Sequence, residues 1–127
     1  MFRDTKTFSG FAVDDARRAR EFYGDTLGVS VETVDEENGL LVLHLAGDRD
    51  TFVYQKPDFT PADYTILNFA VDDIDAAVDA LSERGVRFER YDGFEQDEKG
   101  ISRAASGGPD IAWFKDPAGN ILSVLHQ

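Results

Sequence analysis

The pentapeptide FAVDD occurs twice in the chain, as Phe11–Asp15 and as Phe69–Asp73, with a separation of 58 residues (69 − 11 = 58). The residues after the two copies are also similar: the first continues ARRAREFYGDTLGVSVE and the second IDAAVDALSERGVRFER. With one residue skipped, GVSVE of the first copy aligns with GVRFE of the second. An internal repeat of this length indicates a structural unit that the chain uses twice.

Each copy has the local pattern of a strand, a helix and a second strand. The residues before each Asp pair are apolar or small, and aspartate is a good N-cap residue for a following helix. In both copies a glycine, Gly28 or Gly85, stands where a left-handed helix end favours glycine. In the second copy one apolar stripe at helical spacing comprises Ile74, Ala77, Val78 and Leu81.

More strands are predicted after each repeat. In the first half, LLVLHLAG and TFVYQ flank a turn at Gly47 and Asp48. In the second half, IAWFK and ILSVLHQ flank DPAGN, whose turn residues at turn spacing predict a β-hairpin. We therefore predict an α+β fold of two tandem βαβββ modules, roughly residues 4–57 and 63–127, within one domain of residues 1–127.

The composition excludes several classes of partner. The chain has 25 acidic and 13 basic residues, a net charge of −12 and a pI near 4.4, which argues against nucleic acids and anionic membranes. Such charge would attract a cationic small molecule, but a solvated acidic surface, as in a protein from a salt-rich cytoplasm or a GC-rich genome, is the commoner explanation. Acidity alone therefore identifies no ligand.

Cysteine is absent, and no apolar run reaches the length of a membrane span or a signal peptide. Disulfides and thiolate metal sites are therefore excluded, and we expect a cytoplasmic location. Of the serines, none stands in a nucleophile-elbow context, so no catalytic residue is identified. General acid–base catalysis by one buried carboxylate stays open, because such a group has no spacing signature.

Three stretches carry a resemblance to a known family: EFYGDTLGV, VDDIDAAVDALSERGVRFE and IAWFKDPAGNILSV. They resemble the vicinal oxygen chelate superfamily, which includes glyoxalase I, bleomycin-resistance proteins, extradiol dioxygenases and fosfomycin-inactivating enzymes. The likeness covers almost the whole chain and is strongest to glyoxalase-like members without an assigned reaction. It implies that the two modules form one incomplete barrel around a ligand cavity, with the helices outside.

Metal-dependent members of that superfamily hold a divalent ion with His and Glu on cavity-facing strand positions. The resemblance places three of these positions at Phe8, Ile66 and Ser123, and the fourth at Thr51 or Val53. None of these is a strong metal ligand, so we expect no metal and no other cofactor. This weakens every function in which a metal provides Lewis acidity or activates oxygen.

The only two imidazoles are His44 and His126, and no His-x-His or Glu-x-x-His spacing occurs. His44 lies between apolar residues and His126 is the penultimate residue. We interpret both as packed or strand-edge residues and not as metal ligands.

Strand alternation then predicts the lining of the cavity. If the family's ligand positions face inward, Phe8, Gly10 and Ala12 share the inner face while Phe11 and Val13 pack under a helix. Such a lining suits an apolar or aromatic molecule, with a cationic ligand as a further option. Trp113 would either stack on a flat ligand or belong to the core beside Phe114. The predicted ligand-binding residues are Phe8, Gln55, Ile66, Asn68, Trp113 and Ser123.

The segment 93–110, GFEQDEKGISRAASGGPD, fits neither module well, and we expect it to be irregular or to form a flap. Three functions remain. The first is a metal-free protein that sequesters a drug, as bleomycin-resistance proteins do, and the second is a glyoxalase-like lyase or related metal-dependent enzyme. The third is a binding protein for some other small molecule. We also expect a homodimer.

Overall fold

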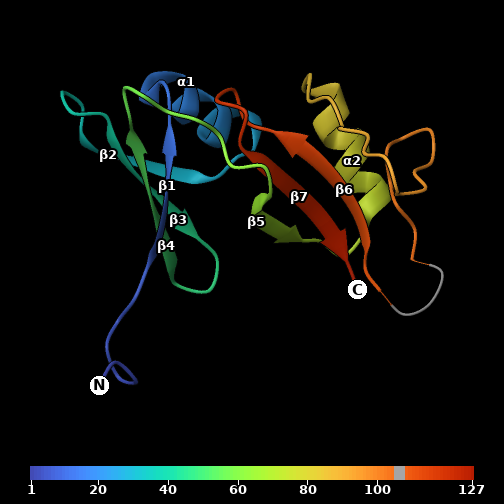
Figure 1. Cartoon of the computed structure of the whole chain (residues 1–127), viewed down its shortest axis with the longest axis horizontal. Coiled ribbons are helices and arrows are strands. Elements are labelled where there is room, and N and C mark those ends of the chain that lie inside the picture. The colour runs from blue at the N-terminus through green and yellow to red at the C-terminus, as the bar shows by residue number, and fades with distance from the viewer. Residues whose placement is uncertain (105–107) are drawn as a thin grey trace. The chain divides into compact units, whose positions relative to one another are not determined.

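The computed structural model describes residues 1–104 and 108–127 (Figure 1). The chain divides into two compact units, Met1–Thr60 and Pro61–Gln127, called here the first and the second unit. Each unit contains one sheet and a helix that follows its first strand, so the predicted α+β class is confirmed. No helix of the described residues is both long and apolar enough to cross a membrane.

The first unit has the predicted βαβββ order, with a π-helical turn added after its helix. Its four strands are arranged in the order β1-β4-β3-β2, with β1 parallel to β4 and the other neighbours antiparallel. The elements are β1 (Ser9–Val13), α1 (Ala16–Glu21), η1 (Phe22–Thr26), β2 (Ser30–Asp35), β3 (Leu40–Leu45) and β4 (Arg49–Gln55).

One face of this sheet is covered by α1 and η1. Phe11 pairs with Val53, and Val53 with Leu41, so these three side chains share a face. The ring of Phe11 lies 5.7 Å from that of Tyr23 in η1, and Tyr23 is fully buried. Burial of these apolar side chains under the helix stabilises the unit.

The second unit has three regular strands, in the order β5-β7-β6, and a longer helix. Its elements are β5 (Thr65–Ala70), α2 (Ile74–Glu83), β6 (Asp110–Lys115) and β7 (Ile121–His126). The predicted hairpin is confirmed, because β6 and β7 are antiparallel and joined through the turn at residues 116–120. The predicted helical stripe is also confirmed, since Ile74 and Val78 are buried and Ala77 and Leu81 half-buried.

The strand predicted directly after α2 is the main correction to the predicted order. It is reduced to one isolated bridge, between Phe88 and Phe114. After Glu89, whose backbone N–H donates to Trp113 O, the chain leaves the sheet edge: the N–H of Tyr91 donates to the side chain of Gln96 instead. A local side-chain partner therefore replaces the ladder of a fourth strand.

The two copies of FAVDD are the strand-to-helix junctions of the two units. The Asp15 carboxylate accepts hydrogen bonds from Arg17 N and Arg18 N, and that of Asp73 accepts one from Ala76 N. The second aspartate of each pair is thus the N-cap, which confirms the predicted helix starts.

The segment 93–110 contains no helix among its described residues, and its regular structure is an isolated bridge from Ser102 to Ile111 and the first residue of β6. It is nevertheless held in place: Asp97 Oδ1 accepts from Lys99 N and Ile101 N, and Ile101 is fully buried. The predicted irregularity agrees with these described residues. Its central residues 105–107 lie outside them.

Candidate functional site

The face of the second sheet opposite α2 brings together three of the predicted site residues. Ser123 on β7 pairs with Asn68 on one side and with Trp113 on the other. Because paired residues on neighbouring strands point to the same face, these three form one row across the whole sheet. We call Asn68, Ser123 and Trp113 the central row. Leu122 and Val124, the neighbours of Ser123 on β7, point to the opposite face, which α2 covers, and are buried.

Ser123 and Asn68 form a polar pair within the central row. Ser123 Oγ donates a 2.5 Å hydrogen bond to Asn68 Oδ1. Ser123 is fully buried and Asn68 is exposed, so the bond holds the amide of Asn68 at the sheet surface. A hydroxyl and an amide in this arrangement offer hydrogen-bonding groups to a ligand on an otherwise apolar sheet.

Trp113 ends the row inside an aromatic cluster of Tyr91, Phe94 and Trp113. Its ring centroid lies 5.4 Å from that of Tyr91, at 80°, and 4.9 Å from that of Phe94, at 60°. Trp113 is 9% exposed, so it is mostly buried, yet it lies on the face away from α2. This packing agrees with the interpretation of Trp113 as a core residue, and its stacking on a ligand stays a prediction.

Three residues near the row were not predicted from the sequence. Tyr91 and Phe94 stand in the irregular stretch after Phe88, where no periodicity predicts which way a side chain points. Glu89 adjoins Trp113 through its backbone, with Glu89 N donating to Trp113 O at 2.8 Å, and its carboxylate is 3.6 Å from Lys115 Nζ. Glu89 directly follows Phe88, so the bridge from Phe88 to Phe114 fixes the position of Glu89 beside Trp113. The sequence alone does not predict that bridge.

The hydroxyl of Tyr91 is buried and has no hydrogen-bond partner in the described part of the chain. Burial raises the pKa of the Tyr91 phenol above its ordinary value, and the nearby charge of Glu89 raises it further. The phenol is therefore protonated at neutral pH and able to donate.

Ile66 has a less definite place on this sheet. Thr65 pairs with Ile121 and Leu67 with Leu122, so the register shifts at Ile66 and leaves it without a partner on β7. Ile66 is half-buried. The alternation that was expected to place Ile66 and Asn68 on one face is interrupted between them.

In the first unit, the face opposite α1 carries Phe8. The ring of Phe8 stacks on that of Phe52 at 4.7 Å and 28°, and Phe8 is 60% exposed. Phe52 pairs with Gly10, and Tyr54 with Ala12, so these residues share the face. The predicted frame of the first strand agrees with this arrangement.

The predicted frame of the fourth strand was wrong by one residue. Thr51 and Val53 are buried on the helix-covered face, where Thr51 pairs with Leu43. Gln55 pairs with Val13, and its Oε1 accepts a 2.9 Å hydrogen bond from Ala16 N at the start of α1. A shift of one residue turns every side chain of a strand to the other face, so Tyr54, not Gln55, lies with Phe8.

A charged triad lies at the other end of the same face. His44 Nδ1 is 2.9 Å from an Asp50 carboxylate oxygen, and its Nε2 is 2.9 Å from one of Glu32. The hydrogen bonds with the two carboxylates raise the pKa of His44, and the bond with Asp50 has the larger effect. His44 is thus tied to two carboxylates on an exposed strand surface; His126 instead contacts Val71 O at 2.9 Å.

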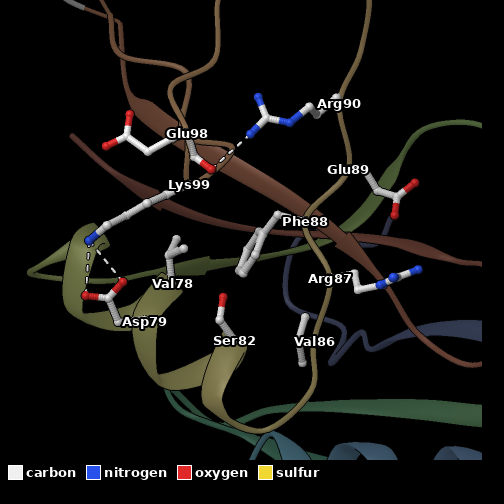
Figure 2. Close-up of a pocket in the computed structure, with 10 residues that line it drawn as sticks. All are labelled: Val78, Asp79, Ser82, Val86, Arg87, Phe88, Glu89, Arg90, Glu98 and Lys99. Carbon is white, nitrogen blue, oxygen red and sulfur yellow. Dashed lines mark hydrogen bonds and ion pairs between the residues drawn. The ribbon is translucent and has the colours of Figure 1, made fainter.

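A groove of about 620 Å³ lies on the helix side of the second unit, between α2 and the segments around Phe88 and Lys99 (Figure 2). Two of its charged side chains have partners inside the groove: Lys99 Nζ lies 2.9 Å from an Asp79 carboxylate oxygen, and the Arg90 guanidinium donates to the backbone oxygen of Glu98 at 3.0 Å. These contacts explain the groove as a structural junction of α2 with the segment at residues 97–103, so we place no ligand there.

The family model of the Glyoxalase/Bleomycin resistance protein/Dioxygenase superfamily matches residues 8–124 of the chain. The chain belongs to this superfamily. The comparison with curated proteins finds no match.

Solved structures with the same fold include two proteins that are described as glyoxalase family or superfamily members. A glyoxalase family protein from Enterococcus faecalis has a TM-score of 0.68 at 20% identity, over 98% of this chain and 99% of that one. A superfamily member from Sphaerobacter thermophilus DSM 20745 has a TM-score of 0.68 at 23% identity, over 96% and 98%. TnmS3, an antibiotic-binding protein from Streptomyces sp. CB03234, has a TM-score of 0.69 at 22% identity, over 97% of each chain. At these identities the likeness shows the fold alone.

The residues at the superfamily's expected metal positions do not fit a divalent ion. Phe8 offers a phenyl ring, Ile66 an alkyl chain, and Ser123 a hydroxyl that already donates to Asn68. The corrected frame of β4 moves the fourth position to the face of Asp50, whose carboxylate is engaged with His44. Over residues 1–104 and 108–127, no group of three or more His, Asp and Glu side chains is arranged to hold a metal.

Proposed function

We propose that this superfamily member is a metal-free, glyoxalase-like protein that binds a small apolar or aromatic molecule. Its binding surface is the central row with the aromatic cluster around Trp113, and Phe8 provides a second aromatic surface on the first unit. The single observation that carries the proposal is the register that places Trp113, Ser123 and Asn68 side by side. A large aromatic surface beside a few polar groups is typical of small-molecule sites.

The proposal of drug binding has one further support. TnmS3, which shares the fold over 97% of each chain, is an antibiotic-binding protein. Since one fold carries many functions, this likeness supports a binding role for the chain without identifying its ligand. A cytoplasmic location, a homodimeric state and a preference for cationic ligands are predictions from the sequence alone.

The test uses the only tryptophan of the chain as the reporter. Titration with 2-acetylnaphthalene, a flat neutral aromatic ketone, should quench the fluorescence of Trp113 if the ligand stacks there. By calorimetry, Trp113→Ala should weaken binding by about 1–3 kcal/mol, the scale of a lost stacked ring and its buried area. Asn68→Ala should cost less than about 2 kcal/mol.

Controls separate a binding defect from a folding defect. Trp113→Phe retains an aromatic ring and should lose less affinity than Trp113→Ala, while Phe2→Ala removes an exposed ring and should change nothing. The melting temperature is measured on the same samples. An unfolded Trp113→Ala variant, or a folded one with unchanged affinity, would contradict the proposed surface.

The alternative is a glyoxalase-like lyase or a related metal-dependent enzyme with ligands other than Phe8, Ile66 and Ser123. Elemental analysis of the purified protein distinguishes the two. We expect no stoichiometric Zn, Ni, Mn or Fe, and no change in melting temperature on addition of a chelator. A bound stoichiometric metal whose removal lowers the melting temperature would favour the enzyme.

A further inference from the structure

The hydroxyl of Tyr91 has no hydrogen-bond partner among the described residues, although the backbone N–H and the ring of Tyr91 both have partners. The oxygen is buried without a hydrogen bond among the described residues, while the ring packs at 80° on Trp113. Most buried side-chain polar atoms in folded proteins have a partner, because leaving one unpaired costs free energy. An unpaired phenol inside the aromatic cluster therefore needs a physical reason.

The position of Tyr91 is fixed by Gln96, so the unpaired hydroxyl does not result from a loose segment. Gln96 Oε1 accepts from Tyr91 N at 2.9 Å. Gln96 Nε2 donates to Glu89 O at 2.9 Å and to Gly100 O at 2.8 Å. One side chain thus ties together the chain before and after Tyr91. A donor that is held this firmly is preorganised, which lowers the entropy lost when it binds a partner.

We propose that Tyr91 determines ligand specificity, its hydroxyl donating a hydrogen bond to a carbonyl or ether oxygen of an aromatic ligand that stacks on Trp113. The inference rests on the proposed function and deepens it, because it specifies the ligand as a flat aromatic molecule with an acceptor oxygen. Protonation is secured at neutral pH, since burial and Glu89 both raise the pKa of Tyr91. The polar pair of Asn68 and Ser123 is separated from Tyr91 by Trp113 in the row, so the two polar groups address different parts of such a ligand.

The test combines two probes with two variants. 2-Acetylnaphthalene carries the acceptor oxygen, and 2-isopropenylnaphthalene has the same flat shape with a methylene group in its place. Tyr91→Phe removes only the hydroxyl. Thr33→Val is the matched control, because Thr33 Oγ1 is the other buried side-chain oxygen without a partner in the described residues and lies in the first unit, on β2.

We expect the ratio of the two dissociation constants, ketone to alkene, to rise roughly threefold to tenfold in Tyr91→Phe, the scale of one neutral hydrogen bond. Thr33→Val should leave that ratio unchanged. Tyr91→Phe should also melt at the same or a higher temperature, because it removes a buried hydroxyl that has no partner among the described residues.

Two failures are distinguishable. If both probes bind with quenching of Trp113 but the ratio is the same in the wild type and in Tyr91→Phe, the Tyr91 inference is overturned and the proposed function stands. That is also the result expected if a water molecule satisfies the hydroxyl. If neither probe binds the wild type, both the proposed function and the inference are overturned.

Discussion

The two copies of FAVDD form the same junction but lead into helices of different length. The N-cap residues have nearly the same backbone angles, φ −143° and ψ 109° at Asp15 and φ −137° and ψ 101° at Asp73. From the N-cap to the left-handed glycine, however, the first copy takes 13 residues (28 − 15) and the second 12 (85 − 73). One additional residue must therefore be accommodated before Gly28.

The π-helical turn accommodates that residue. In the second unit α2 ends with Val86 N donating to Leu81 O and Gly85 N to Ser82 O, the pattern of a Schellman motif. In the first unit the corresponding hydrogen bond runs from Val29 N to Tyr23 O and spans one residue more than the bond from Val86 N to Leu81 O. A second hydrogen bond, from Leu27 N to Phe22 O, closes the π-turn. A π-turn contains one residue more than an α-helical turn, so it accommodates the additional residue at the helix end without a shift of the strands.

Matched deletions test this comparison and should have the largest effect. Removal of Ala77 from α2 turns the residues after it by about 100° and takes Val78 and Leu81 off the sheet. We expect a loss of about 3–6 kcal/mol in unfolding free energy, the scale of two aliphatic side chains, measured by urea denaturation.

Removal of the exposed Asp25 should instead convert η1 to an α-helical turn at a much lower cost, about 1–2 kcal/mol, since Tyr23 before it keeps its buried position. Equal losses of unfolding free energy for the two deletions would show that the π-turn does not accommodate an additional residue.

The hairpin turns of the two units differ in how they are held. In the second unit Asp116 is buried, and its carboxylate accepts from Ala118 N at 3.0 Å and from Asn120 N at 2.9 Å. In the first unit Asp48 only occupies a left-handed position, with φ 59°. Asp116→Ala should cost about 2–3 kcal/mol in thermal or urea unfolding, because two backbone N–H groups, one buried and one half-buried, lose their carboxylate acceptor.

Asp48→Gly is the comparison for that variant. Glycine tolerates a positive φ, so the change should alter the unfolding free energy by less than about 1 kcal/mol. A cost for Asp48→Gly as large as that for Asp116→Ala would mean that the two turns are stabilised in the same way.

The N-caps should give smaller and matched effects. Asp15→Ala and Asp73→Ala should each lower the unfolding free energy by about 1 kcal/mol, the usual value for a lost cap. Asp14→Ala and Asp72→Ala remove the same charge from a strongly acidic chain and leave the cap in place. If the controls lose as much stability as the cap variants, charge and not capping explains the repeated Asp pair.

The sequence was sufficient for features that depend on local chemistry. Aspartate before an apolar helical stripe, glycine after it and the DPAGN turn each predicted an element that the structure contains. The frame of β4 could not be fixed, because its Thr, Phe, Val and Tyr side chains suit either face of a sheet. Register, which decides the face, depends on partner strands that lie far away in the sequence.

The candidate site was predicted in part for the same reason. The alternation of β7 and β5 was enough to place Ser123 and Asn68 on one face, and their pairing adds Trp113. Tyr91 and Phe94 follow a strand that is reduced to one bridge, so no period extends to them. Their contacts with Trp113 are tertiary, and nothing in their local sequence predicts them.

The single histidines of the two units differ as well, and this gives the smallest expected effect. His44 bridges Glu32 and Asp50, whereas His126 contacts a backbone carbonyl. Because the two carboxylates raise the pKa of His44 above its ordinary value of 6.5, protonated His44 favours the folded state. That contribution is fully present below pH 6.5 and is lost as the pH rises through the raised pKa.

The difference in melting temperature between the wild type and His44→Gln should therefore be larger at pH 6 than at pH 9, with the wild type the more stable at pH 6. Other groups titrate in both proteins, so the difference isolates His44. Asp50→Asn removes the larger cause of the shift, and the pKa of His44, followed by NMR, should fall toward 6.5. Because the triad is exposed, added salt should weaken the pH-dependent difference. A difference that is constant from pH 6 to pH 9 would mean that His44 contributes by packing on the strand, and the two units would then use their histidines alike.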